Sequence, residues 1–175
     1  MPQYIRAFVP GGTFFFTVAL LERQRTLLID HIDLLRKAFI DARRRRPCTI
    51  DAIVVLPDHL HCIWTLPPDD ADFSTRWHDI KSRFSAGIEP GERLSTRRAS
   101  KGERGIWQRR FWEHCIRDEH DFAHHADYLH FNPVKHGHAT RVVDWPHSSF
   151  HRYVKNGVYS ADWGGTQQAA ITRIE

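Results

Sequence analysis

Two apolar segments joined by a very short turn place the strongest constraint on the fold of this chain. Residues 50–56 and 60–66 are largely apolar and have the length of typical strands. The Pro57-Asp58 pair between them is characteristic of a tight turn, because proline presets its backbone angle and aspartate bonds to nearby amides. The two segments are therefore predicted to form an antiparallel hairpin.

The rest of the chain predicts further strands and helices around this hairpin. Residues 13–21 are β-branched and aromatic and follow a Pro-Gly-Gly turn, so they are expected to form a strand. Apolar residues three and four positions apart predict an amphipathic helix over 27–45, which Pro47 ends. The remaining expected elements are a helix over 72–86, a loop over 89–105, a strand over 110–116 and a helix over 118–132.

This order of elements predicts an α+β fold of the ferredoxin-like type, an antiparallel sheet with helices packed on one face. The length of 175 residues suits one domain, expected over residues 1–150, followed by a loosely ordered tail over 151–175. Residues 164–168 are small and polar and read as part of that tail. The charged fraction of 26% and hydrophobic fraction of 41% exclude a mainly disordered or fibrous chain.

Cysteine usage and hydropathy point to the cytoplasm. The three cysteines are far apart and odd in number, which argues against a disulfide framework or a cysteine-rich zinc site. The longest apolar run, residues 14–21, is too short to span a bilayer and has no basic flank or cleavage site of a signal peptide. We therefore expect a cytoplasmic protein with no membrane partner.

Charge is modest overall but unevenly distributed. The net charge is +4, whereas ten basic and four acidic residues between Arg76 and Arg110 give that segment +6. A second cluster comprises residues 43–46, all arginine. Both clusters fit solvated loops and helix ends, and both also fit a surface that binds a polyanion. Tryptophans at positions 77, 107 and 112 interleave with these cations, as in proteins that stack single-stranded bases.

Two histidines in the second strand of the hairpin are candidate metal ligands. His59 and His61 are two residues apart, so their side chains lie on one face of a strand while Leu60 points to the opposite face. Neutral imidazoles ligate Mn, Fe, Ni and Zn, so this pair provides half of a metal site. The alternative is a pair of partly exposed histidines that bond only to neighbouring groups.

A second set of polar residues shares one flank of the helix predicted over 118–132. Tyr128 and Asn132 are four residues apart and therefore adjacent on the helix, and Asp121 and His125 continue the flank upstream. We expect this helix to lie across the sheet and face the strand that bears His59 and His61. The amide oxygen of Asn132 can then complete a three-ligand metal site, and the Tyr128 hydroxyl can attack a phosphate. A half-buried aromatic residue without chemistry is the alternative reading of Tyr128.

Four segments together resemble one known family. Residues 11–18, 56–64, 106–114 and 127–137 are similar, in order, to motifs of the REP-associated tyrosine transposases, relatives of the bacterial HUH single-strand transposases. The resemblance spans about residues 10–150, most of the chain. It implies a metal-dependent enzyme that nicks and rejoins single-stranded DNA at hairpins of repetitive extragenic palindromes.

The resemblance also implies roles for individual residues. His59 and His61 become metal ligands with Leu60 between them, and Tyr128 becomes the nucleophile that forms a 5′-phosphotyrosine. Asn132 takes the place of a glutamine ligand in relatives, and Pro133 after it is expected to end the helix, so Asn132 is a candidate for displacement in the absence of DNA. The expected cofactor is Mg²⁺ or Mn²⁺, with no small-molecule cofactor, and a monomer is favoured over a dimer.

DNA contacts are expected at two kinds of position. The first is the N-terminal motif with Gly12, Thr13 and Phe15, which resembles the family's element for the tetranucleotide beside the hairpin. The second is a set of residues expected to hold phosphates: Arg43, Arg44, Arg83, Arg109, Arg110, His114, His125, Lys135, His136 and His138. For His125, assistance in deprotonating Tyr128 is a further candidate role.

Two other functions stay open at this point. The first is a regulator that binds the palindromic hairpin and has no activity. The second is a metal-dependent phosphoesterase that activates water and does not need Tyr128. A covalent protein–DNA adduct distinguishes the three, because only the transposase forms one.

Overall fold

The computed structural model describes residues 6–164, and residues 165–175 of the expected tail lie outside this range. The four strands are β1 (Thr13–Ala19), β2 (Thr49–Val55), β3 (His59–Thr65) and β4 (Trp112–Cys115). They form one antiparallel sheet in the order β2-β3-β1-β4. The four predicted strands and the hairpin are confirmed, with bounds that differ by up to two residues.

The first predicted helix is two helices. α1 (Leu27–Asp30) and α2 (Ile32–Arg45) are separated at His31, so the prediction of one continuous helix over 27–45 is wrong. α3 (Phe73–Ala86) begins where predicted, because the Asp72 side chain accepts a hydrogen bond from the Thr75 amide and caps the helix. The expected loop over 89–105 contains the short helix α4 (Thr96–Ala99).

The second long helix extends past the proline expected to end it. α5 spans Glu119–Lys135 with Pro133 inside it, and the His136 amide still donates to the Asn132 carbonyl at 3.0 Å. Pro133 removes one donor from the helix, but both Pro133 and Asn132 are buried. Packing thus outweighs the local preference, so the expectation that Pro133 ends the helix is wrong and Asn132 lies within α5.

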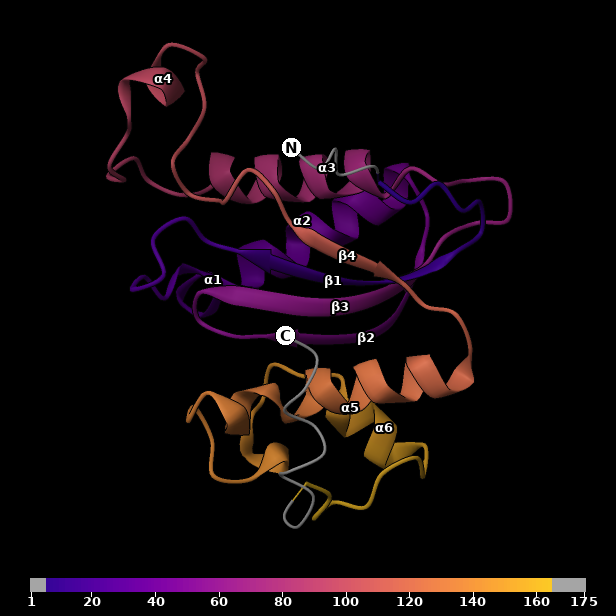
Figure 1. Cartoon of the computed structure of the whole chain (residues 1–175). Helices are drawn as coiled ribbons and strands as arrows, with labels where there is room; N and C mark the ends of the chain where they lie inside the picture. Colours follow the sequence, from indigo (N-terminus) through magenta and orange to yellow (C-terminus); the bar gives the residue numbers. More distant parts are fainter. Residues whose placement is uncertain (1–5, 165–175) are drawn as a thin grey trace, which may run out of the picture.

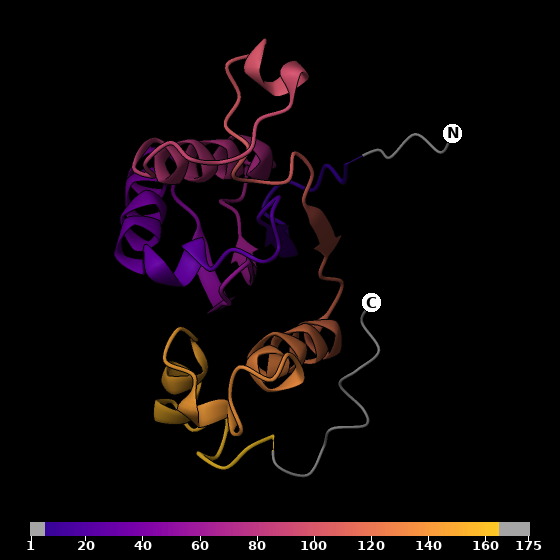
Figure 2. The ribbon, with the colours of Figure 1, turned by 90° about the vertical axis from the view of Figure 1, so that its left-hand side faces the viewer.

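Helices cover both faces of the sheet, so the prediction of helices on one face is wrong. α2 and α3 lie on one side, and α5 and α6 (Phe150–Lys155) lie on the other (Figures 1 and 2). The physical reason is visible in β3, where the residues on both faces are buried. A sheet buried on both sides needs a helical layer on each side to exclude water.

The segment after α5 packs closely on that helix. A 3-10 turn (Val142–Asp144) leads to α6, and Tyr153, Tyr159 and Trp163 pack against the apolar cluster that α5 shares with the sheet. His130 on α5 bonds to the Ser149 hydroxyl at 2.8 Å. The expected boundary after residue 150 therefore falls inside α6, and the described part of the expected tail rests on the domain.

No described helix is long and apolar enough to cross a membrane. The three cysteines are free thiols, and two of them, Cys48 and Cys62, are buried. Burial raises the pKa of both thiols, which keeps them protonated and unreactive. Their role in the core is that of small apolar side chains.

Candidate active site on the α5 face of the sheet

The alternation of β3 brings the two motif histidines to the α5 face. His59, His61 and Ile63 point toward α5, while Leu60 and Cys62 pack in the core under α2 and α3. The ring centroids of His59 and His61 are 5.0 Å apart, and the rings are nearly perpendicular. The sequence prediction that they share a face is confirmed, and both are buried.

Each histidine is held through its Nδ1 atom. His59 Nδ1 donates to Asp58 Oδ1 at 2.7 Å, and Arg23 forms an ion pair with the same carboxylate. His61 Nδ1 shares a hydrogen bond of 2.8 Å with the Thr17 hydroxyl. Outer partners of this kind fix the ring orientation of metal-binding histidines. They leave the Nε2 atoms for another ligand.

Asn132 completes the group from α5. The Nε2 atom of His61 and both side-chain amide atoms of Asn132 are buried without a hydrogen bond of standard geometry among the described residues. The amide is nevertheless close enough to both imidazoles to favour their protonated forms weakly. Buried polar atoms without partners are rare and costly. Two imidazole nitrogens and an amide oxygen are a donor set that fits a divalent ion.

The electrostatics favour the ligating form of both histidines. Burial lowers the pKa of His59, although the hydrogen bond to Asp58 opposes the shift. Burial lowers the pKa of His61 well below its usual value, and the neighbouring His59 adds to this effect. Both imidazoles are therefore neutral near pH 7, and neutral imidazole is the form that binds metals.

Tyr128 lies against this group. Its ring centroid is 5.4 Å from that of His61, and its side chain is 1% exposed. Lys135 Nζ donates to the Tyr128 hydroxyl at 3.4 Å and lies 4.8 Å from the centre of the ring. The sequence assigned Lys135 to phosphate binding, and the structure places it on the candidate nucleophile. The positive charge of Lys135 stabilises the negative charge that develops on a reacting phenol oxygen.

A cavity of about 380 Å³ adjoins His59. Cations and imidazoles gather in its lining, namely Arg23, Arg25, His59, His136 and His138. The His136 ring is 5.1 Å from the His59 ring, which agrees with its expected place near the site. Sequence reasoning missed Arg23, Arg25, Asp58 and Thr17, although the Arg-Gln-Arg run at 23–25 and the acid before His59 were visible signals.

The curated relatives of this chain belong to one family. No protein-family model matches the chain. A REP-associated tyrosine transposase of Escherichia coli K12 is 48% identical over 165 residues, which cover 94% of this chain and 92% of the relative. A Haemophilus influenzae relative described as the same kind of transposase is 43% identical over 98% of both chains.

The chain belongs to the REP-associated tyrosine transposases. A solved structure of such a transposase bound to a REP hairpin superposes with a TM-score of 0.81 at 47% identity and covers 100% of this chain and 99% of the other. The family resemblance expected from the four sequence motifs is confirmed.

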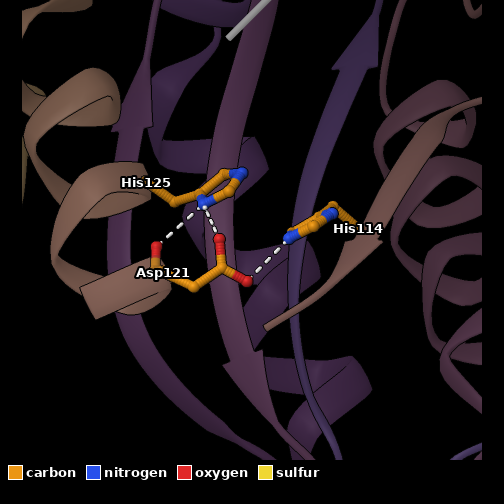
Figure 3. A group of neighbouring side chains, drawn as sticks. All are labelled: His114, Asp121 and His125. Carbon is orange, nitrogen blue, oxygen red and sulfur yellow. Dashed lines mark hydrogen bonds and ion pairs between the residues drawn. The ribbon is translucent and has the colours of Figure 1, made fainter. Parts of the chain in front are cut away.

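A second histidine cluster of this transposase lies between β4 and α5 (Figure 3). His114 Nε2 is 2.8 Å from one Asp121 carboxylate oxygen, and His125 Nδ1 is 3.1 Å from the other. His125 Nδ1 also lies 2.8 Å from the Asp121 backbone carbonyl. The three side chains offer nitrogen and oxygen ligands within 4.8 Å of one another, so the group could hold a metal ion.

Asp121 in this second cluster is already well satisfied. The oxygen that bonds to His114 also accepts from the backbone amide and the guanidinium of Arg117. Burial opposes ionisation of Asp121, but these hydrogen bonds outweigh it and hold its pKa well below the usual range. A buried carboxylate with this many donors is stable without a metal. His125 contacts Phe15 and His114, so its geometry supports a structural role in the hub formed by His114, Asp121 and His125.

The other predicted DNA contacts of the transposase are dispersed. Thr13 pairs with Thr65, at the end of β1 opposite to the His59 end, and Gly12 precedes it. Phe15 is fully buried between His61, His125 and Tyr128. The remaining residues lie elsewhere: Arg43, Arg44 and Arg83 in the layer of α2 and α3, and Arg109 and Arg110 on the chain leading to β4.

Proposed function

We propose that this chain is a metal-dependent endonuclease and strand transferase that acts on single-stranded DNA at REP-type hairpins. The observation that carries the proposal is the position of Tyr128 beside His61, together with the unpartnered polar atoms of His61 and Asn132. A solved relative with the same fold is bound to a REP hairpin, which supports this class of substrate.

The metal ligands in this proposal are His59, His61 and Asn132. When bound, Mg²⁺ or Mn²⁺ would supply positive charge that polarises a phosphate oxygen of the DNA. The structure supports this donor set because Asp58 and Thr17 orient the two imidazoles from outside. All ligands and Tyr128 come from one chain, which favours a monomer as the active form.

Tyr128 is the proposed nucleophile. Its hydroxyl loses a proton, and the oxygen forms a bond to phosphorus while the bond from phosphorus to the 3′ oxygen breaks. The 3′ oxygen gains a proton, so the products are a 5′-phosphotyrosine and a free 3′-hydroxyl. The reverse reaction with another 3′-hydroxyl joins strands without an external energy source. Lys135 stabilises the negative charge that forms on the tyrosine oxygen.

Access to this nucleophile requires movement. Tyr128 is 1% exposed, and Lys135 lies over its ring. The cavity beside His59 is the open approach, and its arginines and histidines complement a phosphodiester backbone. We infer that DNA enters through this cavity to reach the metal site, and that the Lys135 ammonium moves off the ring while it stays beside the Tyr128 oxygen.

The test is formation of a covalent adduct. The full chain is incubated with Mn²⁺ and a labelled REP hairpin that has single-stranded flanks, and the products are separated on a denaturing gel. The expected result is an adduct with wild type and with the Tyr153→Phe control, and none with Tyr128→Phe. Tyr153 is a suitable control because it bonds to the Asp51 carbonyl and its ring contacts His130, outside the group of His59 and His61. An adduct with Tyr128→Phe would overturn the proposal.

Burial of Tyr128 is the observation that favours a second candidate, a regulator that binds the hairpin and does not cut it. In that case the same experiment gives a shifted complex on a native gel and intact DNA on the denaturing gel. A phosphoesterase that activates water gives cut DNA without an adduct, with equal activity in Tyr128→Phe.

A further inference from the structure

Trp112 stands apart from the other tryptophans that the sequence placed among cations. Trp77 and Trp107 are buried in the core under α3, whereas Trp112 is 44% exposed. It begins β4, the strand at one edge of the sheet. Of these three rings, Trp112 is therefore the one that can meet a ligand.

The strand register places Trp112 in line with the candidate metal site. Thr17 of β1 is opposite His61 of β3 on one side and opposite Trp112 of β4 on the other. The Cα atoms of Trp112 and His61 are thus separated by two strand spacings, about 10 Å in total. Phe15 contacts Trp112 as well as His61 and Tyr128. A DNA strand whose phosphate reaches Tyr128 would therefore pass close to the Trp112 indole.

The second histidine cluster packs against the Trp112 indole and holds it in place. The Trp112 and His114 rings are nearly parallel, at 9° and 6.0 Å between centroids, and the His114 and His125 rings are stacked at 15° and 4.5 Å. Asp121 bonds to both imidazoles and holds them in these orientations (Figure 3). The rings of Trp112, His114 and His125 thus form a row, and Trp112 is at its solvent-exposed end. A rigid ring loses little entropy when it binds, which suits it to stacking.

Exposed cations flank this row. Arg110 precedes Trp112 by two residues and has no ion-pair partner in the part of the chain that the structure describes. Arg117 follows β4, and its side chain is largely exposed although it bonds to Asp121. Aromatic faces beside arginines are the arrangement that binds single-stranded nucleic acid.

We propose that Trp112 stacks an unpaired base of the single-stranded DNA next to the phosphate that Tyr128 attacks. The Asp121 cluster acts as the support that keeps the indole in place. This inference rests on the proposed function, because it assigns a position for one nucleotide of that substrate. Stacking on one ring tolerates any base, so Trp112 contributes affinity and placement more than sequence readout.

The test compares two DNA probes by fluorescence anisotropy. One is a labelled REP hairpin with single-stranded flanks of about six nucleotides, a length within the usual site size for such grooves. The other is the same hairpin without flanks. Trp112→Ala is expected to bind the flanked hairpin about 10-fold more weakly than wild type and the bare hairpin equally well. Trp112→Phe is expected to restore most of the loss.

Two controls separate stacking from other effects. Ile40→Ala removes an exposed apolar side chain on α2, on the opposite layer, and should leave both affinities unchanged. The dependence of affinity on salt should be the same in Trp112→Ala and wild type, because no phosphate contact is lost, and shallower in Arg110→Ala.

An abasic scan keeps the test independent of any variant that fails to fold. With wild-type protein, one abasic position in the flanks should reduce affinity about 10-fold, and with Trp112→Ala the same position should have no effect. Equal affinity of wild type and Trp112→Ala for the flanked hairpin, or no sensitive position in the scan, overturns the inference. Failure of the proposed function appears separately, as wild-type protein that binds but forms no covalent adduct.

Discussion

The two histidine clusters on the α5 face are chemically similar and differ in how their polar atoms are satisfied. His114 and His125 bond to a carboxylate that has several other donors. His61 and Asn132 instead have buried atoms without partners of standard geometry among the described residues. A set of potential ligands alone therefore does not distinguish a metal site from a structural hub. The unpartnered atoms are the reason why we propose the first cluster as the metal site.

Metal affinity is expected to show the largest difference between the clusters. His61→Ala removes a direct ligand and should weaken Mn²⁺ binding by more than about 100-fold, since even outer partners of ligands contribute about 10–100-fold. His125→Ala is the matched control and should change the affinity by less than about twofold. Titration calorimetry measures both. Loss of Mn²⁺ binding in His125→Ala with retention in His61→Ala would reverse the assignment.

Stability is expected to respond most strongly in the second cluster. Asp121→Ala leaves His114 and the Arg117 amide without their acceptor at a part-buried position, so the free energy of unfolding should fall by about 1–2 kcal/mol. Urea denaturation of the metal-free protein measures this change. Asp33→Ala, at an exposed position on α2, is the control and should stay within about 0.5 kcal/mol of wild type. An equally small effect for Asp121→Ala would show that the hub has no structural role.

The contribution of Asp121 should depend on pH in a defined direction. Its folded-state pKa is lowered, so its stabilising effect is complete above the unfolded value near 3.9 and is lost as pH falls below it. The stability difference between wild type and Asp121→Asn should therefore shrink as the pH falls from about 4 to 2. Denaturation curves across this range test it. A difference that grows on acidification would contradict the hydrogen-bonded, ionised state of Asp121.

The smallest expected effect is a gain in stability, in contrast to the loss expected for Asp121→Ala. Asn132→Leu replaces an unpartnered buried amide with an apolar side chain of similar size, so the metal-free protein should gain about 1 kcal/mol of stability. The same variant should lose Mn²⁺ affinity. Denaturation without metal and calorimetry with metal separate the two effects. A loss of stability would mean that the amide already has a structural partner.

Local spacing made much of the site predictable. The alternation of a strand placed His59 and His61 together, and the helical repeat of four placed Tyr128 beside Asn132. What brings these two pairs into contact is the packing of α5 on the sheet, which no local pattern specifies. The helix with Tyr128 was expected to face the strand of His59 and His61, but the other helices were expected on that same face, so the second helical layer was not expected.

Charge was the least predictable property, because its role depends on partners distant in the sequence. Arg76 counted toward a basic surface, but it is buried, pairs with Asp70 and donates to three main-chain carbonyls. Arg104 likewise pairs with Glu92 and bonds to the Ser85 and Ile88 carbonyls. Arg23 and Arg25, outside the counted clusters, line the cavity beside His59. Side-chain packing thus decides which cations remain for DNA.

The position of Mn²⁺ in crystals of the full chain tests the central claim most directly. Anomalous scattering from crystals grown with Mn²⁺ locates the ion without reference to activity. We expect an anomalous peak within bonding distance of His59, His61 and Asn132, and none at His114, Asp121 and His125. A peak at the second cluster with none at the first would contradict it.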